Sequence, residues 1–169
     1  MEKEITEVYC GNGRGKTTLA IGQALRASSQ GKSVIIIQFL KGNERRELDF
    51  LEELDQLDIK IFRFEKMESC YDQLNEEEQA EEERNILNGL NFARKVIATQ
   101  ECDFLVLDEI LGLLDKHIAT VDMVVGLLKQ KDESMHLILT GNRVDPGILD
   151  YVDSVTTITT LERDKMPLV

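Results

Sequence analysis

The sequence predicts an α/β fold with a mainly parallel sheet covered by helices on both faces. Short apolar runs typical of strands alternate along the chain with segments whose apolar residues recur at helical spacing. The run Val-Ile-Ile-Ile at 34–37 lacks polar–apolar alternation, which is typical of a strand buried on both faces. A glycine-rich stretch, Gly-Asn-Gly-Arg-Gly-Lys-Thr-Thr at 11–18, separates the first apolar run from the first helical segment.

The first half of the chain is expected to hold three strands and two helices. After a strand at 5–10, a helix over 16–29 ends just before Gly31, because glycine readily adopts the left-handed turn that stops a helix. Its packed side consists of Leu19, Ala20, Ala24 and Ala27. The elements that follow are a strand at 34–37, a helix at 44–54 and a strand at 59–64.

The second half begins with a long helix over 75–98. Asn75 precedes three glutamates, and carboxylates are favourable at the positive end of a helix. The helically spaced apolar set is Ile86, Leu90, Ala93 and Ile97. Then come a strand at 104–107, a helix at 121–129 capped by Thr120, a strand at 136–140, a short helix from Asp145-Pro146, and a strand at 154–160. Proline suits the first helical position because no intrahelical bond is lost there.

The glycine-rich stretch is interpreted as a phosphate-binding loop, or P-loop. Such a turn lets successive backbone N–H groups converge on phosphate oxygens, and the following helix adds partial positive charge. Lys16 would reach the distal phosphates, and the Thr17 hydroxyl would bind magnesium. The strict motif has glycine where this chain has Cys10, whereas a dinucleotide-binding turn would need glycine in place of Lys16 and is disfavoured. The expected nucleotide-binding residues are Gly11, Asn12, Gly13, Arg14, Gly15, Lys16, Thr17 and Thr18.

Two acids form the second chemical signal. Asp108 and Glu109 follow the apolar run at 104–107, so they are expected at the carboxyl edge of the sheet, beside the P-loop. One acid could bind magnesium directly or through water, and the other could set its coordination or position a reacting group. Alone, the pair could simply cap a helix. Together with the P-loop it predicts a nucleotide–magnesium site.

Polar residues after two other strands are weaker candidates for the same edge. They are Gln38 and Lys41 after the isoleucine-rich strand, and Thr140, Asn142 and Arg143 after the strand at 136–140. Ordinary loop polarity explains each of them singly. The two histidines, His117 and His136, lie far apart without a partnering motif, so neither is expected to bind metal or to act as a general base.

Composition limits the function. The chain of 169 residues suits a single domain, 1–169, and its formal net charge of −12 argues against nucleic-acid binding. No apolar run approaches the roughly 20 residues of a membrane span, and early glutamates interrupt any signal-like stretch. Three widely spaced cysteines argue against a disulfide framework. A cytoplasmic protein without membrane attachment is therefore expected.

Several motifs, taken in order, resemble those of the P-loop type ATP:corrinoid adenosyltransferases. They are Cys-Gly-Asn-Gly-Arg-Gly-Lys-Thr-Thr-Leu-Ala at 10–20, Leu-Arg-Ala at 25–27, Gln-Phe-Leu-Lys-Gly at 38–42, Leu-Asp-Glu at 107–109 and Leu-Thr-Gly at 139–141. The resemblance covers about 8–155, and the family tolerates a residue other than glycine at the position of Cys10. It implies a single P-loop nucleotide-binding domain of RecA-like fold over 1–169.

The resemblance implies an unusual use of ATP. Cobalt(I) of a corrinoid attacks the 5′ carbon and expels triphosphate, as in adenosylcobalamin biosynthesis or salvage. Lys16, the loop amides and magnesium on Thr17 and Asp108 or Glu109 would stabilise the leaving group, with Lys16 and Glu109 in catalytic roles. Cobalt(I) is a strong nucleophile, so no protein base is needed.

The resemblance also implies where the corrinoid binds and which partners the chain has. Family members use a segment between the third strand and the long helix, here 64–75, with aromatic residues that displace the lower axial ligand; this segment lacks tryptophan. Tyr71 is the nearest aromatic candidate, because Phe62 and Phe64 are expected in the strand and core. Gln38, Lys41 and Arg143 complete the implied ligand-binding set. A homodimer and a reductase that supplies the electron for cobalt are also implied.

Two other functions remain open. One is a RecA-like ATPase or kinase, which would need a group that positions water or binds an acceptor. The other is an ATP-binding regulatory or carrier protein without turnover. The presence of both acids beside Lys16 and Thr17 favours catalysis over the second alternative.

Overall fold

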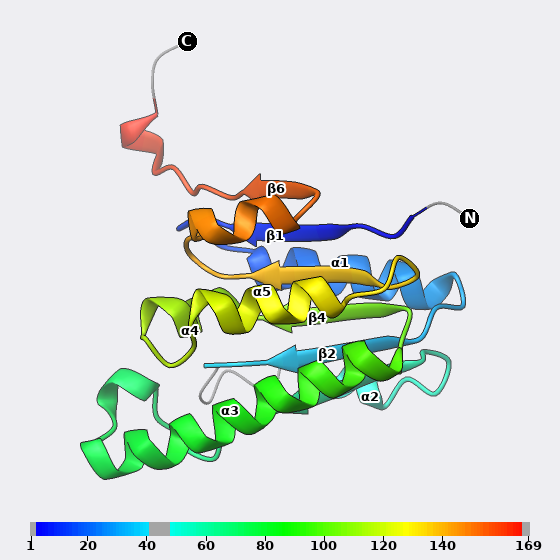
Figure 1. Cartoon of the computed structure of the whole chain (residues 1–169). Helices are drawn as coiled ribbons and strands as arrows, with labels where there is room; N and C mark the ends of the chain where they lie inside the picture. The colour runs from blue at the N-terminus through cyan, green and yellow to red at the C-terminus, as the bar shows by residue number, and fades with distance from the viewer. Residues whose placement is uncertain (1–2, 41–47, 167–169) are drawn as a thin grey trace.

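The computed structural model describes residues 3–40 and 48–166. Six strands form one parallel sheet in the order β3-β2-β4-β5-β1-β6 (Figure 1). They are β1 (Thr6–Cys10), β2 (Val34–Gln38), β3 (Ile59–Arg63), β4 (Phe104–Asp108), β5 (His136–Thr140) and β6 (Ser154–Thr157). The α/β fold with a parallel sheet is therefore confirmed.

Helices cover both faces of this sheet. They are α1 (Lys16–Ser29), α2 (Asp49–Glu52), α3 (Glu76–Thr99), α4 (Ile110–Asp115) and α5 (Val121–Gln130), with 3-10 turns η2 (Tyr71–Gln73), η3 (Pro146–Tyr151) and η4 (Arg163–Lys165). In Figure 1, α3 and α5 lie in front of the sheet and α1 lies behind it. Over residues 3–40 and 48–166, no helix is long and apolar enough to cross a bilayer.

The isoleucine-rich strand β2 explains the two-layered core. All five of its residues are buried, and successive side chains point to opposite faces. Ile35 and Ile37 join the cluster formed with α3 and α5, whereas Val34 and Ile36 join the cluster formed with α1. The absence of polar–apolar alternation therefore reflects burial on both sides, as expected.

Helix starts follow the capping residues that the sequence displays. The Asn75 side chain accepts from the Glu78 N–H at 2.9 Å, and the Glu78 carboxylate accepts from the Asn75 N–H at 3.0 Å, which completes a capping box for α3. The Thr120 hydroxyl accepts from the Met123 N–H at the start of α5. Asp145 caps a helix with proline in its first turn, but this helix is 3-10 rather than α.

Three elements differ from expectation. A helix is expected over 44–54, and the structure describes α2 over Asp49–Glu52 within this range. Residues 41–47 lie outside the described residues. The last strand ends at Thr157 instead of at 160, because the next residues turn to contact the P-loop. The short helix α4 was not expected, and Glu109 at its start has a left-handed φ of 63°.

Gly89 gives a direct test of the packing between α3 and the sheet. A Cβ there would lie 2.8 Å from Phe64 Cγ and 2.9 Å from Phe39 Cε1. Gly89→Ala is therefore expected to lower the free energy of unfolding by about 1–3 kcal/mol in urea titrations. In Gly126→Ala, on α5, the new Cβ meets nothing within 4 Å, so this control should stabilise the fold by up to about 1 kcal/mol. Equal stability of Gly89→Ala and the unmodified chain would contradict this packing.

Candidate active site

The P-loop connects the end of β1 to the start of α1. Lys16 is only 9% exposed, and its ammonium folds back beneath the loop. Its Nζ donates to Gly11 O at 2.7 Å and to Gly13 O at 3.1 Å. Among the described residues no side chain caps α1, so the partial positive charge of this helix end is left to an anion. The local geometry therefore matches the predicted phosphate-binding loop.

The segment after β6 approaches the P-loop closely. Gly13 N–H donates to Ile158 O at 2.9 Å, and Arg14 N–H donates to Thr160 Oγ1 at 3.0 Å. A Cβ at Gly13 would lie 2.6 Å from Ile158 O, and one at Gly11 would collide with the same atom. These glycines are required because another backbone passes against them. The sequence pattern, which predicted a continuing strand here, did not reveal this contact.

Asp108 is the acid that the structure brings to the P-loop. It lies at the end of β4 with 1% of its surface exposed. Thr17 Oγ1 donates to its Oδ1 at 3.0 Å, and Thr140 Oγ1 donates to the same oxygen at 2.7 Å. Gln38 Nε2 donates to Oδ2 at 3.1 Å. Four polar residues from separate elements thus meet at the carboxyl edge of the sheet, as the sequence predicted for this edge.

Glu109 occupies the tight turn between β4 and α4. Its φ of 63° is unfavourable for a residue with a Cβ, at a cost of order 1–3 kcal/mol. The turn is held by the Glu109 N–H, which donates to Thr140 Oγ1 at 2.8 Å. Its carboxylate lies beside Gly112, where an added Cβ would be 3.2 Å from Glu109 Oε2. Thr17 donates a hydrogen bond to the neighbouring acid, Asp108.

The residues at this edge fit a magnesium ion. A threonine hydroxyl and a buried carboxylate are hard oxygen ligands of the kind that Mg²⁺ prefers, and Thr17 and Asp108 lie in direct contact. In the described parts of the chain, no group of three or more histidine, cysteine, aspartate or glutamate residues could hold a metal. An ion here would complete its shell with phosphate oxygens and water, as Mg²⁺ commonly does.

Tyr71 lies apart from the P-loop contacts. It sits in η2, where its hydroxyl donates to Glu83 Oε1 on α3, and Lys116 Nζ lies 5.8 Å from the centre of its ring. Burial, followed by the hydrogen bond to Glu83, raises the pKa of Tyr71 to about 12. The phenol is therefore neutral at physiological pH. These two contacts join it to Glu83 on α3 and to Lys116, which follows α4.

The remaining predicted ligand residues have different positions. Arg143 Nη2 donates to Asp115 Oδ1 at 2.8 Å, and the neighbouring Asn142 O accepts from Gly11 N–H at 2.9 Å. Arg143 borders a hollow of about 350 Å³ between α4 and the loop after β5. A hollow of about 650 Å³ borders the P-loop and the exposed side of α1, including Arg14 and Thr18. Lys41 lies outside the described residues.

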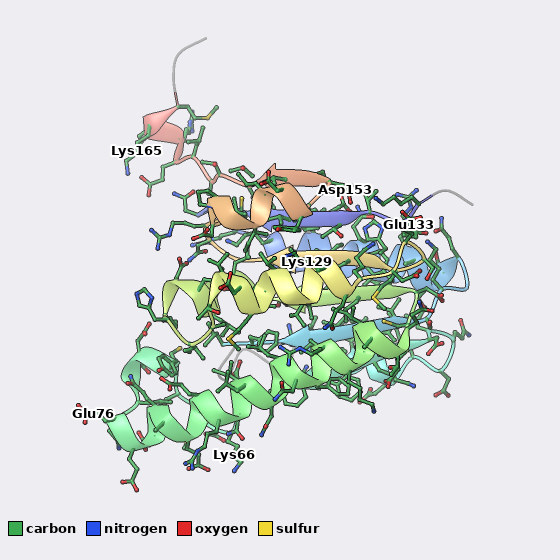
Figure 2. The ribbon with its side chains drawn as sticks, in the orientation of Figure 1. Lys66, Glu76, Lys129, Glu133, Asp153 and Lys165 are labelled. Atoms are coloured by element: carbon green, nitrogen blue, oxygen red, sulfur yellow. The ribbon has the colours of Figure 1, made fainter. Side chains whose placement is uncertain are left out.

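A buried carboxylate that the sequence analysis overlooked holds the segment after β3. Glu82 is 3% exposed, and it accepts from Lys66 N–H at 2.9 Å and from Met67 N–H at 2.8 Å. The Lys66 side chain, labelled in Figure 2, pairs with Glu81, the residue next to Glu82 on α3. The available signal was the position of Glu82, four residues before Ile86 on the buried stripe of α3. Arg63, which donates to Gln38, was also missed.

Comparison with known proteins agrees with this geometry. The model of the family ATP:corrinoid adenosyltransferase BtuR/CobO/CobP matches residues 2–165. The corrinoid adenosyltransferase of Escherichia coli (strain K12) is 30% identical over 162 residues, which span 93% of this chain and 77% of that protein. The corrinoid adenosyltransferase CobA of Salmonella typhimurium (strain LT2) is 28% identical over 160 residues, with 93% and 77% covered.

The fold has a solved counterpart. A KaiC-like protein, PH0186, from the hyperthermophilic archaeon Pyrococcus horikoshii OT3 has a TM-score of 0.61 and 19% identity, covering 92% of this chain and 71% of that one. This likeness concerns the fold alone, and it supports the parallel α/β architecture with helices on both faces of the sheet. The family match spans nearly the whole chain, including the P-loop and the strand that ends in Asp108. The chain therefore belongs to the BtuR/CobO/CobP family of ATP:corrinoid adenosyltransferases.

Proposed function

We propose that the carboxyl edge of the sheet is where this enzyme moves the 5′-deoxyadenosyl group of ATP to cobalt(I) of a corrinoid. The enzyme class and the two substrates follow from the family. The observation that supports the site is the hydrogen bond between Thr17 and the buried Asp108, beside the enclosed Lys16. This arrangement joins a phosphate-binding loop to an acid that can hold a metal.

The triphosphate is proposed to bind over the loop at 11–18 and the start of α1. Lys16 Nζ donates to two loop carbonyl groups, and oxygens of a bound triphosphate would accept these hydrogen bonds in their place. Gln38, Lys41 and Arg143 are proposed to contact the substrates from neighbouring strand ends. Support for Gln38 is its bond to Asp108, and support for Arg143 is its place beside a hollow at the same edge.

Thr17 and Asp108 are proposed to hold Mg²⁺ together with phosphate oxygens. When bound, the ion would neutralise charge that develops on the leaving triphosphate. Glu109 is proposed to shape the outer coordination sphere, because its N–H holds the Thr140 hydroxyl that donates to Asp108. This refines the sequence-based expectation, which left the choice between the two acids open.

The reaction is a substitution at carbon in which no proton moves. The electron pair of cobalt(I) forms a bond to the 5′ carbon of ATP while the bond from that carbon to oxygen breaks. The departing pair leaves with triphosphate, and cobalt ends formally as cobalt(III). The protein therefore needs to align cobalt with the 5′ carbon and to stabilise the leaving group, which is the task proposed for Lys16 and the loop amides.

Product analysis tests this function. The protein would be mixed with magnesium-ATP and chemically reduced cobalamin or cobinamide without oxygen, and both the corrinoid spectrum and the phosphate products would be followed. We expect triphosphate together with a light-sensitive adenosyl corrinoid. ADP and phosphate formed without corrinoid would instead indicate an ordinary ATPase, and ATP binding without product would indicate a regulatory protein.

Tyr71 is proposed to replace the lower axial ligand of cobalt, which makes cobalt(II) easier to reduce. We expect Tyr71→Ala to lose more activity with cobalt(II) substrate and a weak reductant than with cobalt(I) prepared in advance. Tyr71→Phe keeps the ring and removes the bond to Glu83, so it separates the ring from the hydroxyl. Equal losses of Tyr71→Ala activity in the two assays would contradict the axial role.

A homodimer, an electron-donating reductase and a reducing cytoplasm are proposed as the setting of the reaction. The support for a dimer is an exposed apolar set around the edge strand β6. Its members are Leu149, Tyr151, Val155, Leu161 and Met166. Sedimentation equilibrium is expected to give twice the mass of one chain, and a single-chain mass at micromolar concentration would contradict the dimer.

A further inference from the structure

Three side chains lie in register across the carboxyl edge of the sheet. In the parallel ladders, Gln38 of β2 pairs with Arg63 of β3 on one side and with Asp108 of β4 on the other. Side chains at the same level of adjacent strands point to the same face of the sheet. The backbone register therefore places a guanidinium, an amide and a carboxylate in one row.

The hydrogen bonds along this row have a direction. Arg63 Nε donates to Gln38 Oε1 at 3.2 Å, and Gln38 Nε2 donates to Asp108 Oδ2 at 3.1 Å. If the amide were flipped, its oxygen would face the carboxylate and its NH₂ group would face the guanidinium, so both contacts would be repulsive. Arg63 and Asp108 thus hold Gln38 in one orientation, and Gln38 is 3% exposed.

The Asp108 carboxylate is also held by a hydrogen bond on the side opposite Gln38. The Thr140 hydroxyl accepts from the Glu109 N–H, so its own proton is directed to Asp108 Oδ1 at 2.7 Å. Gln38 and Thr140 therefore fix the two carboxylate oxygens from either side. Thr17 donates at 3.0 and 3.2 Å to these oxygens. The orientation that Asp108 presents to Thr17 depends on this support.

We propose that Arg63 is a positioning residue for the magnesium site. It orients the Gln38 amide, and through the amide it holds the Asp108 carboxylate in place for the metal. The inference rests on the proposed role of Thr17 and Asp108 in binding Mg²⁺. Replacing a partner that touches a metal ligand directly, as Gln38 touches Asp108, typically changes metal affinity by about 10–100-fold, and Arg63 acts one contact further out, through Gln38. In this role Arg63 acts on metal affinity through Gln38 and Asp108.

Electron paramagnetic resonance of Mn²⁺, titrated into the full chain with saturating ATP, tests this role directly. Arg63→Met keeps the length of the side chain but removes the donor, and it is expected to weaken Mn²⁺ binding about tenfold. Arg63→Lys keeps a charged donor and should remain within about threefold of the unmodified chain. Arg94→Met is the matched control, because Arg94 is exposed on α3 with a bond to Asn91. ATP binding in EDTA should be unchanged, whereas misfolding would reduce it.

A double-mutant cycle tests the route through the amide. Gln38→Leu should also weaken Mn²⁺ binding, and adding Arg63→Met to it should cause no further loss, because both changes remove one chain of contacts. If the two losses multiplied in the double variant, or if Arg63→Met bound Mn²⁺ as tightly as the unmodified chain, the proposed role of Arg63 would be overturned. Neither result would affect the proposed metal site. Mn²⁺ binding by the unmodified chain that is no tighter than binding by free ATP would overturn the proposed metal site and this inference with it.

Discussion

Lys16→Ala is expected to reduce the rate of adenosyl transfer by about 10²–10³-fold, the loss typical of removing one donor from a developing anion. Lys16 is the cation enclosed by the P-loop, with its Nζ 2.7 Å from Gly11 O. Alanine would leave the departing triphosphate without this charge at the point where the bond to carbon breaks. The measurement is kcat/KM for ATP at saturating cobalt(I) corrinoid, with triphosphate release as the readout.

Lys129→Ala provides the matched control for this lysine. Lys129 projects from the end of α5 over the Tyr151 ring, 5.3 Å from its centre, and is labelled in Figure 2. Its replacement should leave the transfer rate unchanged, which would show that removing a lysine does not by itself lower activity. Thermal unfolding of Lys16→Ala should follow the unmodified chain within a few degrees, roughly what a change below 1 kcal/mol causes. Unchanged turnover in Lys16→Ala would refute its assignment.

Asp108→Asn is expected to lower magnesium-dependent transfer by about 10²-fold and to raise the Mg²⁺ concentration for half-maximal rate by about tenfold or more. Asparagine has the same shape, but its NH₂ group would face either the Gln38 amide donor or the Thr140 hydroxyl. It also lacks the negative charge that holds the ion. The measurement is the transfer rate as a function of Mg²⁺ at fixed ATP.

Two comparisons make the Asp108 result specific. Asp150→Asn, at an exposed position in η3, should show normal Mg²⁺ dependence. Glu109→Gln should keep the Asp108–Thr17 contact and lose less than Asp108→Asn. The opposite result would be a large loss of Mg²⁺-dependent transfer in Glu109→Gln and a normal response of the transfer rate to Mg²⁺ in Asp108→Asn. In that case the metal ligand would be Glu109, and the assignment based on hydrogen bonds would be wrong.

Local chemistry explains what could be predicted from the sequence. Asn75, Thr120 and the Asp145-Pro146 pair satisfy backbone groups within three residues of themselves, so their effect on helix starts is visible in the chain order. The P-loop motif is equally visible, since its glycines and Lys16 lie close together in the sequence, although Gly11 and Gly13 also face the distant Ile158. The burial of β2 was also visible, because its apolar run Val-Ile-Ile-Ile at 34–37 has no polar face to present to water.

Long-range contacts explain what could not be predicted. The left-handed turn at Glu109 is held by Thr140, which lies 31 residues further along the chain. The hydrogen bond from Thr17 to Asp108 joins residues 91 positions apart, at the start of α1 and the end of β4, so two adjacent acids in the sequence do not reveal it. The connection from Arg63 to Asp108 exists only once β3, β2 and β4 lie in register.

The contact between the P-loop and the segment after β6 has a consequence for how the molecule is made. Arg14 is synthesised well before its partner Thr160, which lies 146 positions further along the chain. Contacts this distant in sequence form late, because the intervening loop must close first. The nucleotide-binding loop therefore acquires its contacts with Ile158 and Thr160 only after the segment that follows β6 has been synthesised.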